Sequence, residues 1–233
     1  MKPHKIDYDL VYKNALEINS REVRDAILNG DKDMSLKINN YSEKYNIPQK
    51  FLKHRILRDP IFANQFAKDP AKQSIHQNTA ASFIESITYV ENFQQLPAGG
   101  QNAKYICKDG ILYTGNRPSG NTVKSIDFYW IYDNKEYYAA HKYTKDEGGA
   151  QDNQWNDLME FLANAAKSRH PNKYFLAIGD GAYYQKEYKE NGIKYTSRID
   201  YMNKTYSTEK ALAITTDELE EFLINNSSFK PIN

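Results

Sequence analysis

An aspartate and a lysine that could act together on a phosphate group, Asp127 and Lys142, lie on either side of a predicted turn. A phosphodiester is hydrolysed when a metal ion neutralises its charge and an activated water attacks the phosphorus. An aspartate suits Mg²⁺, which keeps several waters and binds only one or two protein carboxylates. The positive charge of a neighbouring lysine could orient that water and lower its pKa. The two residues therefore predict a hydrolytic site if the fold brings their side chains together.

Two predicted strands within residues 124–156 would position this pair. The first strand carries Asp127, the second carries Lys142, and Asp133-Asn134-Lys135 forms a tight turn between them. Side chains alternate between the two faces of a strand. Lys142 therefore shares its face with three other residues of the second strand, Glu136, Tyr138 and Ala140.

The remaining elements predict an α/β (α+β) fold with a central mixed sheet flanked by helices. Helices are predicted over residues 8–45, over residues 71–92 and after the glycine pair Gly148-Gly149. Short strands are predicted at residues 103–107, 111–114, 174–178 and 211–214, and Thr215 begins a capping box for a last helix. Residues 185–210 are polar and weakly periodic, which is typical of a loop or ribbon.

The central stretch resembles the PD-(D/E)-x-K nuclease motif of type II restriction endonucleases. Lys124-Ser125-Ile126-Asp127-Phe128 matches the first half of the motif, and Ala140-His141-Lys142 matches the second half. The glycine pair, the glutamine-bearing helix start at residues 151–154, and the strand and turn at residues 174–181 also follow in the expected order. The resemblance extends over roughly residues 70–225 and is more specific than the aspartate and lysine alone.

This resemblance implies a restriction-endonuclease-like nuclease core in residues 71–233. Residues 1–70 would be a helical region for DNA contacts or dimerisation. The implied activity is Mg²⁺-dependent cleavage of double-stranded DNA at a short specific site, in restriction-modification, by a homodimer whose symmetry matches that of the site. Asp127, Ala140 and Lys142 would occupy the catalytic positions. The positions for the metal would be Asp127, Ala140 and His141, the last through its backbone carbonyl.

Ala140 departs from the motif, which has Asp or Glu at this position. A methyl group cannot bind a metal, so three explanations stay open. The chain could be a natural inactive relative, or it could carry an engineered alanine of the kind that traps a nuclease on uncut DNA. The acid could instead have moved to another element, for which the candidates are Glu85, Glu136, Asp146 and Glu147. The fullness of the surrounding match favours the engineered alanine.

Candidate DNA-binding residues lie in three segments. A basic helix contributes Lys53, Arg55 and Arg58, the loop before the first strand contributes Arg117, Ser119 and Lys124, and the helix start contributes Gln151, Asn153 and Gln154. Lysines between residues 186 and 204 alternate with tyrosines that could stack on displaced bases. For each segment the alternative is a solvated charged face, or helix capping at the helix start.

Composition limits the class of protein. The formal net charge of +1 provides no global basic surface, so DNA binding would depend on local clusters. The single cysteine, Cys107, excludes an intramolecular disulfide and fits a reducing compartment. The absence of an apolar leader or membrane-length run leads us to expect a soluble cytoplasmic protein without membrane contacts.

Two other functions remain compatible with the same pattern. One is a junction-resolving or repair nuclease with little sequence preference. The other is a non-catalytic DNA-binding protein of the same fold, which Ala140 favours. Asp127 and Lys142 could also be a cross-strand ion pair worth about 0–1 kcal/mol, but the flanking motifs favour the catalytic interpretation.

Overall fold

The computed structural model describes residues 5–119, 123–145 and 149–228, and the side chains of residues 149–151 lie outside the described part. The chain divides into two compact units. One is Asp7–Asn78, and the other joins Met1–Ile6 to Thr79–Asn233. The division falls inside helix α5 (Ile75–Ser86), and the second unit contains the sheets.

The first unit is helical. It consists of α1 (Tyr8–Leu28), α2 (Lys32–Tyr45), α3 (Gln49–Arg58) and α4 (Pro60–Ala63), followed by the 3₁₀ turns η1 (Asn64–Phe66) and η2 (Pro70–Gln73). Aspartate side chains accept hydrogen bonds from the first backbone N–H groups of several of these helices, which satisfies donors that the helix itself leaves unpaired. Its small core contains Val23, Ile38, Leu52, Ile56, Ala63 and Phe66.

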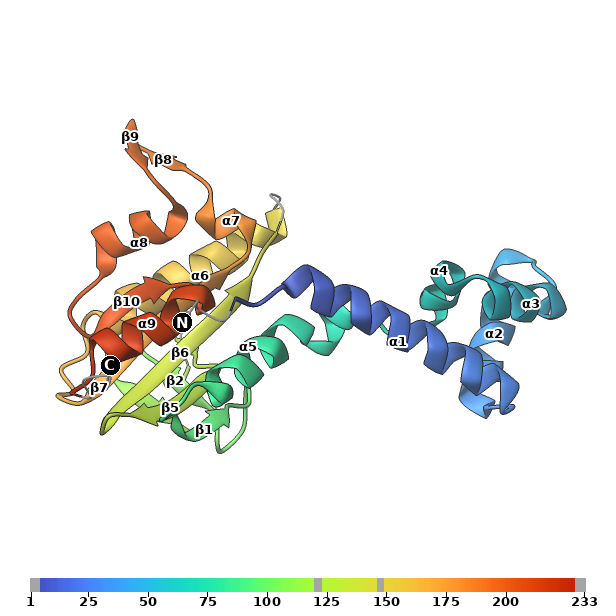
Figure 1. Cartoon of the computed structure of the whole chain (residues 1–233), viewed down its shortest axis with the longest axis horizontal. Helices are drawn as coiled ribbons and strands as arrows, with labels where there is room; N and C mark the ends of the chain where they lie inside the picture. The colour runs from blue at the N-terminus through green and yellow to red at the C-terminus, as the bar shows by residue number, and fades with distance from the viewer. Residues whose placement is uncertain (1–4, 120–122, 146–148, 229–233) are drawn as a thin grey trace. The chain divides into compact units, whose positions relative to one another are not determined.

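The second unit is built on a five-stranded mixed sheet (Figure 1). The strand order is β1 (Glu91–Gln95), β5 (Phe128–Tyr132), β6 (Lys135–Tyr143), β7 (Lys173–Asp180) and β10 (Ala211–Ile214). The first three strands pair antiparallel, whereas β7 pairs in parallel with both β6 and β10. The predicted class, a mixed sheet flanked by helices, is therefore confirmed at the level of an α+β fold.

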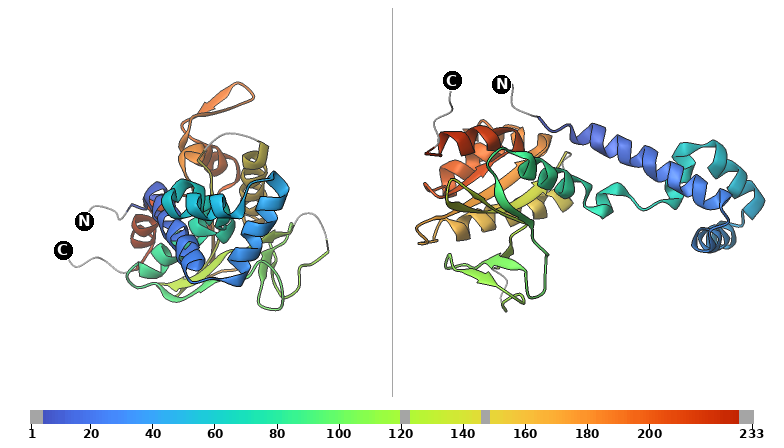
Figure 2. Two further views of the ribbon diagram at one scale, coloured as in Figure 1. Left: turned by 90° about the vertical axis from the view of Figure 1, so that its right-hand side faces the viewer. Right: turned by 60° about the horizontal axis from the view of Figure 1, so that its bottom comes forward.

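Helices cover both faces of this sheet (Figures 1 and 2). On one face, α6 (Gly149–Ala165) and α8 (Arg198–Tyr206) pack with Tyr138 and Ala140 of β6. On the other face, α5 and α9 (Thr216–Asn225) pack with Tyr137 and Ala139 of the same strand. Because successive residues of β6 enter opposite cores, the strand is buried on both sides along residues 137–141.

A smaller sheet directly precedes strand β5 of the larger one in the chain. It has the order β3–β2–β4, with β2 at Lys104–Ile106, β3 at Leu112–Thr114 and β4 at Lys124–Ser125. The predicted hairpin of residues 103–114 is confirmed. Its turn needs Gly110, which has φ +82° and whose missing Cβ would lie 2.5 Å from the backbone of Lys167.

Two sequence predictions were wrong in part. The helix expected over residues 71–92 ends at Ser86, and β1 follows it, because the polar strand Glu-Asn-Phe-Gln-Gln lacks the apolar alternation by which strands are recognised. The stretch 185–210, predicted as a loop or ribbon, does contain a two-stranded ribbon, but the prediction missed a helix. The stretch contains the end of α7 (Ala182–Gln185), a hairpin of β8 (Tyr188–Glu190) and β9 (Ile193–Tyr195), and α8, which Ser197 caps.

A membrane crossing needs a long helix with few charges, and none of the helices in the described ranges meets that requirement.

Candidate active site

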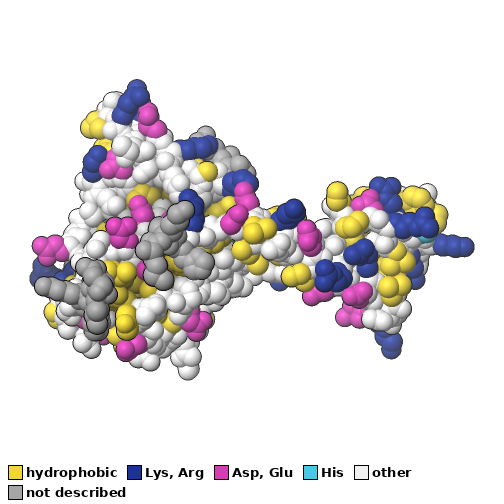
Figure 3. Space-filling model, viewed as in Figure 1, with side chains coloured by type: hydrophobic (Ala, Val, Ile, Leu, Met, Phe, Trp, Pro, Cys, Tyr) yellow, Lys and Arg dark blue, Asp and Glu magenta, His cyan; other side chains and the backbone are white. Residues whose placement is uncertain are grey.

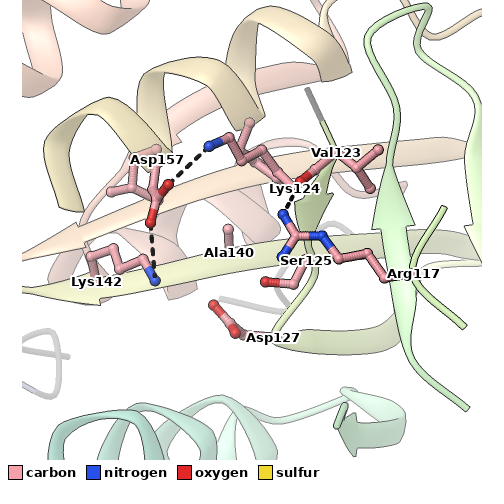
Figure 4. Close-up of a pocket in the computed structure, with 10 residues that line it drawn as sticks. Arg117, Val123, Lys124, Ser125, Asp127, Ala140, Lys142 and Asp157 are labelled. Carbon is pink, nitrogen blue, oxygen red and sulfur yellow. Dashed lines mark hydrogen bonds and ion pairs between the residues drawn. The ribbon is translucent and has the colours of Figure 1, made fainter. Parts of the chain in front are cut away.

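A pocket lies between the corner of the two sheets and helix α6 (Figure 4). Asp127, Ala140 and Lys142 all line it, so the fold brings the three motif positions together. The segment before β5 adds Arg117, Val123, Lys124 and Ser125 to the lining. Helix α6 adds Asp157, Leu158 and Phe161.

Asp127 stands where the chain passes from the small sheet to the large one. The sequence had suggested a position on a strand, but Asp127 lies between β4 and β5. The N–H of Ile126 donates to Lys104 in the small sheet (2.9 Å), whereas the N–H of Asp127 donates to Ala139 in the large sheet (2.8 Å). The Asp127 carboxylate accepts the backbone N–H of His141 at 2.8 Å, which holds it beside β6.

Ala140 and Lys142 enter the pocket from β6, two residues apart on one face. Ala140 is 5% exposed and its methyl group points toward the space between Asp127 and Asp157 (Figure 4). Lys142 lies opposite Gly179, near the C-terminal end of β6, and its side chain is 31% exposed. The position that carries an acid in the motif therefore faces the pocket but supplies no polar atom.

Asp157 is a pocket residue that the sequence analysis missed. Its Oδ1 is 2.9 Å from Nζ of Lys124, and its Oδ2 is 4.0 Å from Nζ of Lys142. Glu160 is also bound to Lys124, at 2.6 Å. The available signal was helical spacing. Asp157 and Glu160 are three residues apart, and each directly precedes an apolar core residue, Leu158 or Phe161. They therefore lie at the edge of the helix face that meets the sheet.

Three cationic side chains, Arg117, Lys124 and Lys142, line the pocket with two carboxylates, Asp127 and Asp157. Glu160 adds a third carboxylate through its ion pair with Lys124, so Arg117 and Lys142 are the cations that an entering anion would meet. Partial burial alone would lower the pKa of Lys124, but its hydrogen bonds to Glu160 and Asp157 outweigh that effect and hold the pKa above its usual value. Lys124 therefore remains charged.

The residues present do not fit Mg²⁺. Asp157 is already bound to Lys124, and Asp127 is then the one carboxylate of the lining that could face a metal. No group of three histidine, cysteine or acidic side chains suited to a metal occurs in the part of the chain that the structure describes. A divalent cation would also meet the positive charges of Arg117 and Lys142, whereas a phosphate would meet them favourably.

His141 belongs to a different environment from its neighbours. Its ring is on the opposite face of β6, where Nε2 lies 3.0 Å from Oδ2 of Asp180 and both side chains are almost fully buried. Asp180 also accepts the N–H of Thr216 (2.9 Å) and its hydroxyl (3.0 Å), which fixes the start of α9. The ring of His141 is thus a structural group and does not reach the pocket.

Two of the proposed replacement acids, Glu136 and Glu85, are not among the residues that line the pocket. Glu136 lies at the other end of β6, where it binds Lys173 at 2.6 Å and accepts the hydroxyl of Tyr138. Burial would raise the pKa of Glu136, but these two hydrogen bonds lower it below its usual value. Glu85 is exposed on α5 and is not among the residues that line the pocket. Asp146 and Glu147 lie outside the described residues.

The DNA-binding candidates are divided between the two units. Lys53, Arg55 and Arg58 belong to α3 of the helical unit, where Arg55 is bound to Asp59 at 3.0 Å. Arg117 and Lys124 line the pocket, and Arg117 donates to the carbonyl of Val123 at 3.1 Å. Three candidates lie outside its lining: Ser119 and Asn153 are exposed, and Gln154 accepts the hydroxyl of Thr144 at 2.8 Å. The side chain of Gln151 lies outside the described part.

Comparison with known proteins yields no relative: no protein-family model, no curated protein and no solved structure matches this chain. The function must therefore be argued from the site itself.

Proposed function

We propose that the protein binds double-stranded DNA as a site-specific endonuclease of the type II restriction class does, and that Ala140 leaves it able to bind DNA but poorly able to cut it. One observation carries the proposal. The pocket holds Asp127 and Lys142 together with two further cations, while the residue between them on the pocket face is an alanine.

The order of elements supports this proposal. Helix α5, the antiparallel strands β5 and β6, helix α6 and the parallel strand β7 occur in this order along the chain. These are the segments on which the resemblance to restriction endonucleases was based: a helix before the hairpin, the hairpin, a glutamine-bearing helix and a strand that ends in a turn. A likeness of fold alone would not specify a function, so the argument depends on the pocket.

The side chains of the pocket would have separate roles in the hydrolysis of a phosphodiester. Arg117 and Lys124 would neutralise a non-bridging oxygen, and Lys142 would orient the attacking water. Asp127, held by the N–H of His141, would accept a hydrogen bond from that water. A second carboxylate would be needed before the pocket could also hold Mg²⁺, which supplies the remaining charge neutralisation in such enzymes.

The test is to restore that carboxylate with Ala140→Glu. We expect this variant to cut a plasmid library of random sequence into discrete fragments in Mg²⁺, and the fragment ends would define the site. Ala140→Gln is the matched control, because its amide has the size of the glutamate side chain without the charge. The double variant Ala140→Glu, Lys142→Ala should bind DNA and leave it intact.

The same experiment decides against the proposal if the restored variant binds duplex DNA but never cuts it with any divalent metal. The protein would then be a non-catalytic DNA-binding protein, the second candidate, which the cationic side chains of the pocket lining and the missing acid at Ala140 favour. Preferential cutting of four-way junctions over linear duplexes would indicate a junction-resolving or repair nuclease.

The two-fold symmetry of most short recognition sites leads us to include a homodimer in the proposal. Sedimentation of the chain with a duplex that carries its site should show two chains per duplex.

A further inference from the structure

We infer that the β8–β9 hairpin is a DNA-contacting ribbon that enters a groove of the duplex with its lysine face. This inference rests on the proposed DNA-binding function and deepens it, because it names the element that contacts the duplex beyond the pocket. Four observations lead to it: the position of the hairpin, its anchoring, the pairing of its lysines and its two-stranded form.

The hairpin projects from the body of its unit (Figures 1 and 2). Tyr188 pairs with Tyr195, and the turn at its tip is Asn191-Gly192, with φ of 49° and 83°. Two consecutive residues with positive φ match a type I′ turn, whose twist suits a regular two-stranded ribbon. The hairpin follows β7 and α7, so it leaves the sheet at the end where Lys142 lies opposite Gly179.

The base of the hairpin is fixed by an aromatic cluster. The ring of Tyr201 on α8 lies 4.9 Å from that of Tyr188 and 5.0 Å from that of Tyr195, in edge-to-face geometry. Trp155 of α6 packs 5.6 Å from Tyr188, and the guanidinium of Arg198 lies 5.3 Å from the same ring. An isolated two-stranded hairpin is only marginally stable in water, so this cluster is what gives the ribbon a defined position.

The two faces of the ribbon differ in charge. Directly paired residues lie on the same face, so Tyr188 and Tyr195 occupy the anchored face and Lys189 and Lys194 occupy the other. Glu190 cannot neutralise this lysine pair, because it belongs to the tyrosine face and accepts the hydroxyl of Tyr188 at 2.6 Å. Figure 3 shows Lys or Arg side chains beside acidic and apolar ones at the upper-left projection.

The lysine pair lowers the stability of the free hairpin. Like charges directly across two strands repel each other. Lys194 has a partner in Glu187 at 3.0 Å, but their side chains are 70% and 64% exposed. Such an exposed ion pair contributes little to stability and can give way to a stronger anion. A phosphate backbone would remove the repulsion, because it brings negative charge to both ammonium groups at once.

Duplex DNA is the anion that the shape of the ribbon fits. The major groove of B-DNA is about 12 Å wide and admits a two-stranded ribbon, and lysines can bind phosphates at its edges or guanine edges within it. An acidic protein could satisfy the charges but would not require a projecting ribbon.

The experiment compares the full-length protein with Lys189→Gln, Lys194→Gln, on a short random-sequence duplex labelled with a fluorophore. We expect weaker binding, and a fall of about two in the slope of log affinity against log salt, one for each lost phosphate contact. Lys189→Arg, Lys194→Arg should retain affinity. The matched control is Lys167→Gln, Arg169→Gln, which removes two exposed charges beyond the C-terminal end of α6 and should leave the slope unchanged.

The outcomes separate this inference from the function on which it rests. If the unaltered protein binds duplex DNA and the glutamine variant has the same affinity and slope as the control, the hairpin is not a DNA contact, and the proposed function stands. If the unaltered protein binds no duplex at low salt, the proposed function itself fails. Loss of binding to polyglutamate with retention of duplex binding would assign the hairpin to an acidic protein and overturn the inference.

Discussion

Two acid–base pairs lie on opposite faces of strand β6, one residue apart, and they differ in almost every physical respect. His141 and Asp180 are nearly fully buried and lie 3.0 Å apart, and Asp180 also accepts two hydrogen bonds from Thr216. Lys142 and Asp127 line an open pocket, where Lys142 is 31% exposed and Asp157 lies at 4.0 Å. The first pair is bonded to other buried protein groups. The second lines a pocket, where its side chains can meet a ligand.

This contrast shows how a structural pair can be distinguished from a functional one. A buried pair whose partners are all protein groups stabilises a connection, here between the end of β7 and the start of α9. A pocket lined by Arg117, Lys124 and Lys142 instead presents cationic groups to a ligand that enters it. Substitutions on the two faces should therefore separate stability from DNA binding.

The largest effect is expected on the buried face. Asp180→Ala should lower the free energy of unfolding by about 3–5 kcal/mol, because it leaves His141 and Thr216 buried without their shared partner. Urea denaturation of the full chain measures this change. Asp180→Asn keeps an acceptor for the N–H of Thr216 and should cost less. A loss of only about 0.5 kcal/mol for the alanine variant, typical of surface sites, would contradict the structural role.

On the pocket face, Lys142→Ala should leave the free energy of unfolding within about 0.5 kcal/mol of the original value, because the side chain is partly exposed and its ion pair with Asp157 is long, at 4.0 Å. The variant should instead bind duplex DNA more weakly, and the slope of log affinity against log salt should fall by about one. Equal salt slopes for Lys142→Ala and the unaltered chain would exclude Lys142 from phosphate contact.

The smallest effect is expected from Asp157→Asn. This change weakens the ion pair with Lys124, whose partner Glu160 remains, so stability should change by no more than about 1 kcal/mol. Removal of one negative charge from the pocket should strengthen duplex binding modestly and increase its salt dependence. Glu221→Gln on α9 is a matched control on a different surface. Weaker binding by Asp157→Asn would instead mean that Asp157 holds Lys124 in its binding position.

Much of the fold could be predicted because it depends on neighbours in the chain. The strand pair around Asp133-Asn134, the Asp109-Gly110 hairpin and the capping box at Thr215 all have turn or cap residues at the required spacing. The polar strand β1 and the capped helix α8 were missed, because their residues do not show the apolar period of their type and their positions depend on contacts with distant segments.

The sequence alone predicted that Ala140 and Lys142 would share one face of their strand and that His141 would lie on the other, because alternation along a strand is a local property of the backbone. The meeting of Asp127 with that face depended on the fold, because Asp127 lies between β4 and β5. Only the tertiary structure decided what each side meets. It placed Asp157 of α6 against Lys124 and Asp180 of β7 against His141. Those partners come from other elements, and their approach is set by the packing of α6 and β7 against β6, which no local pattern specifies.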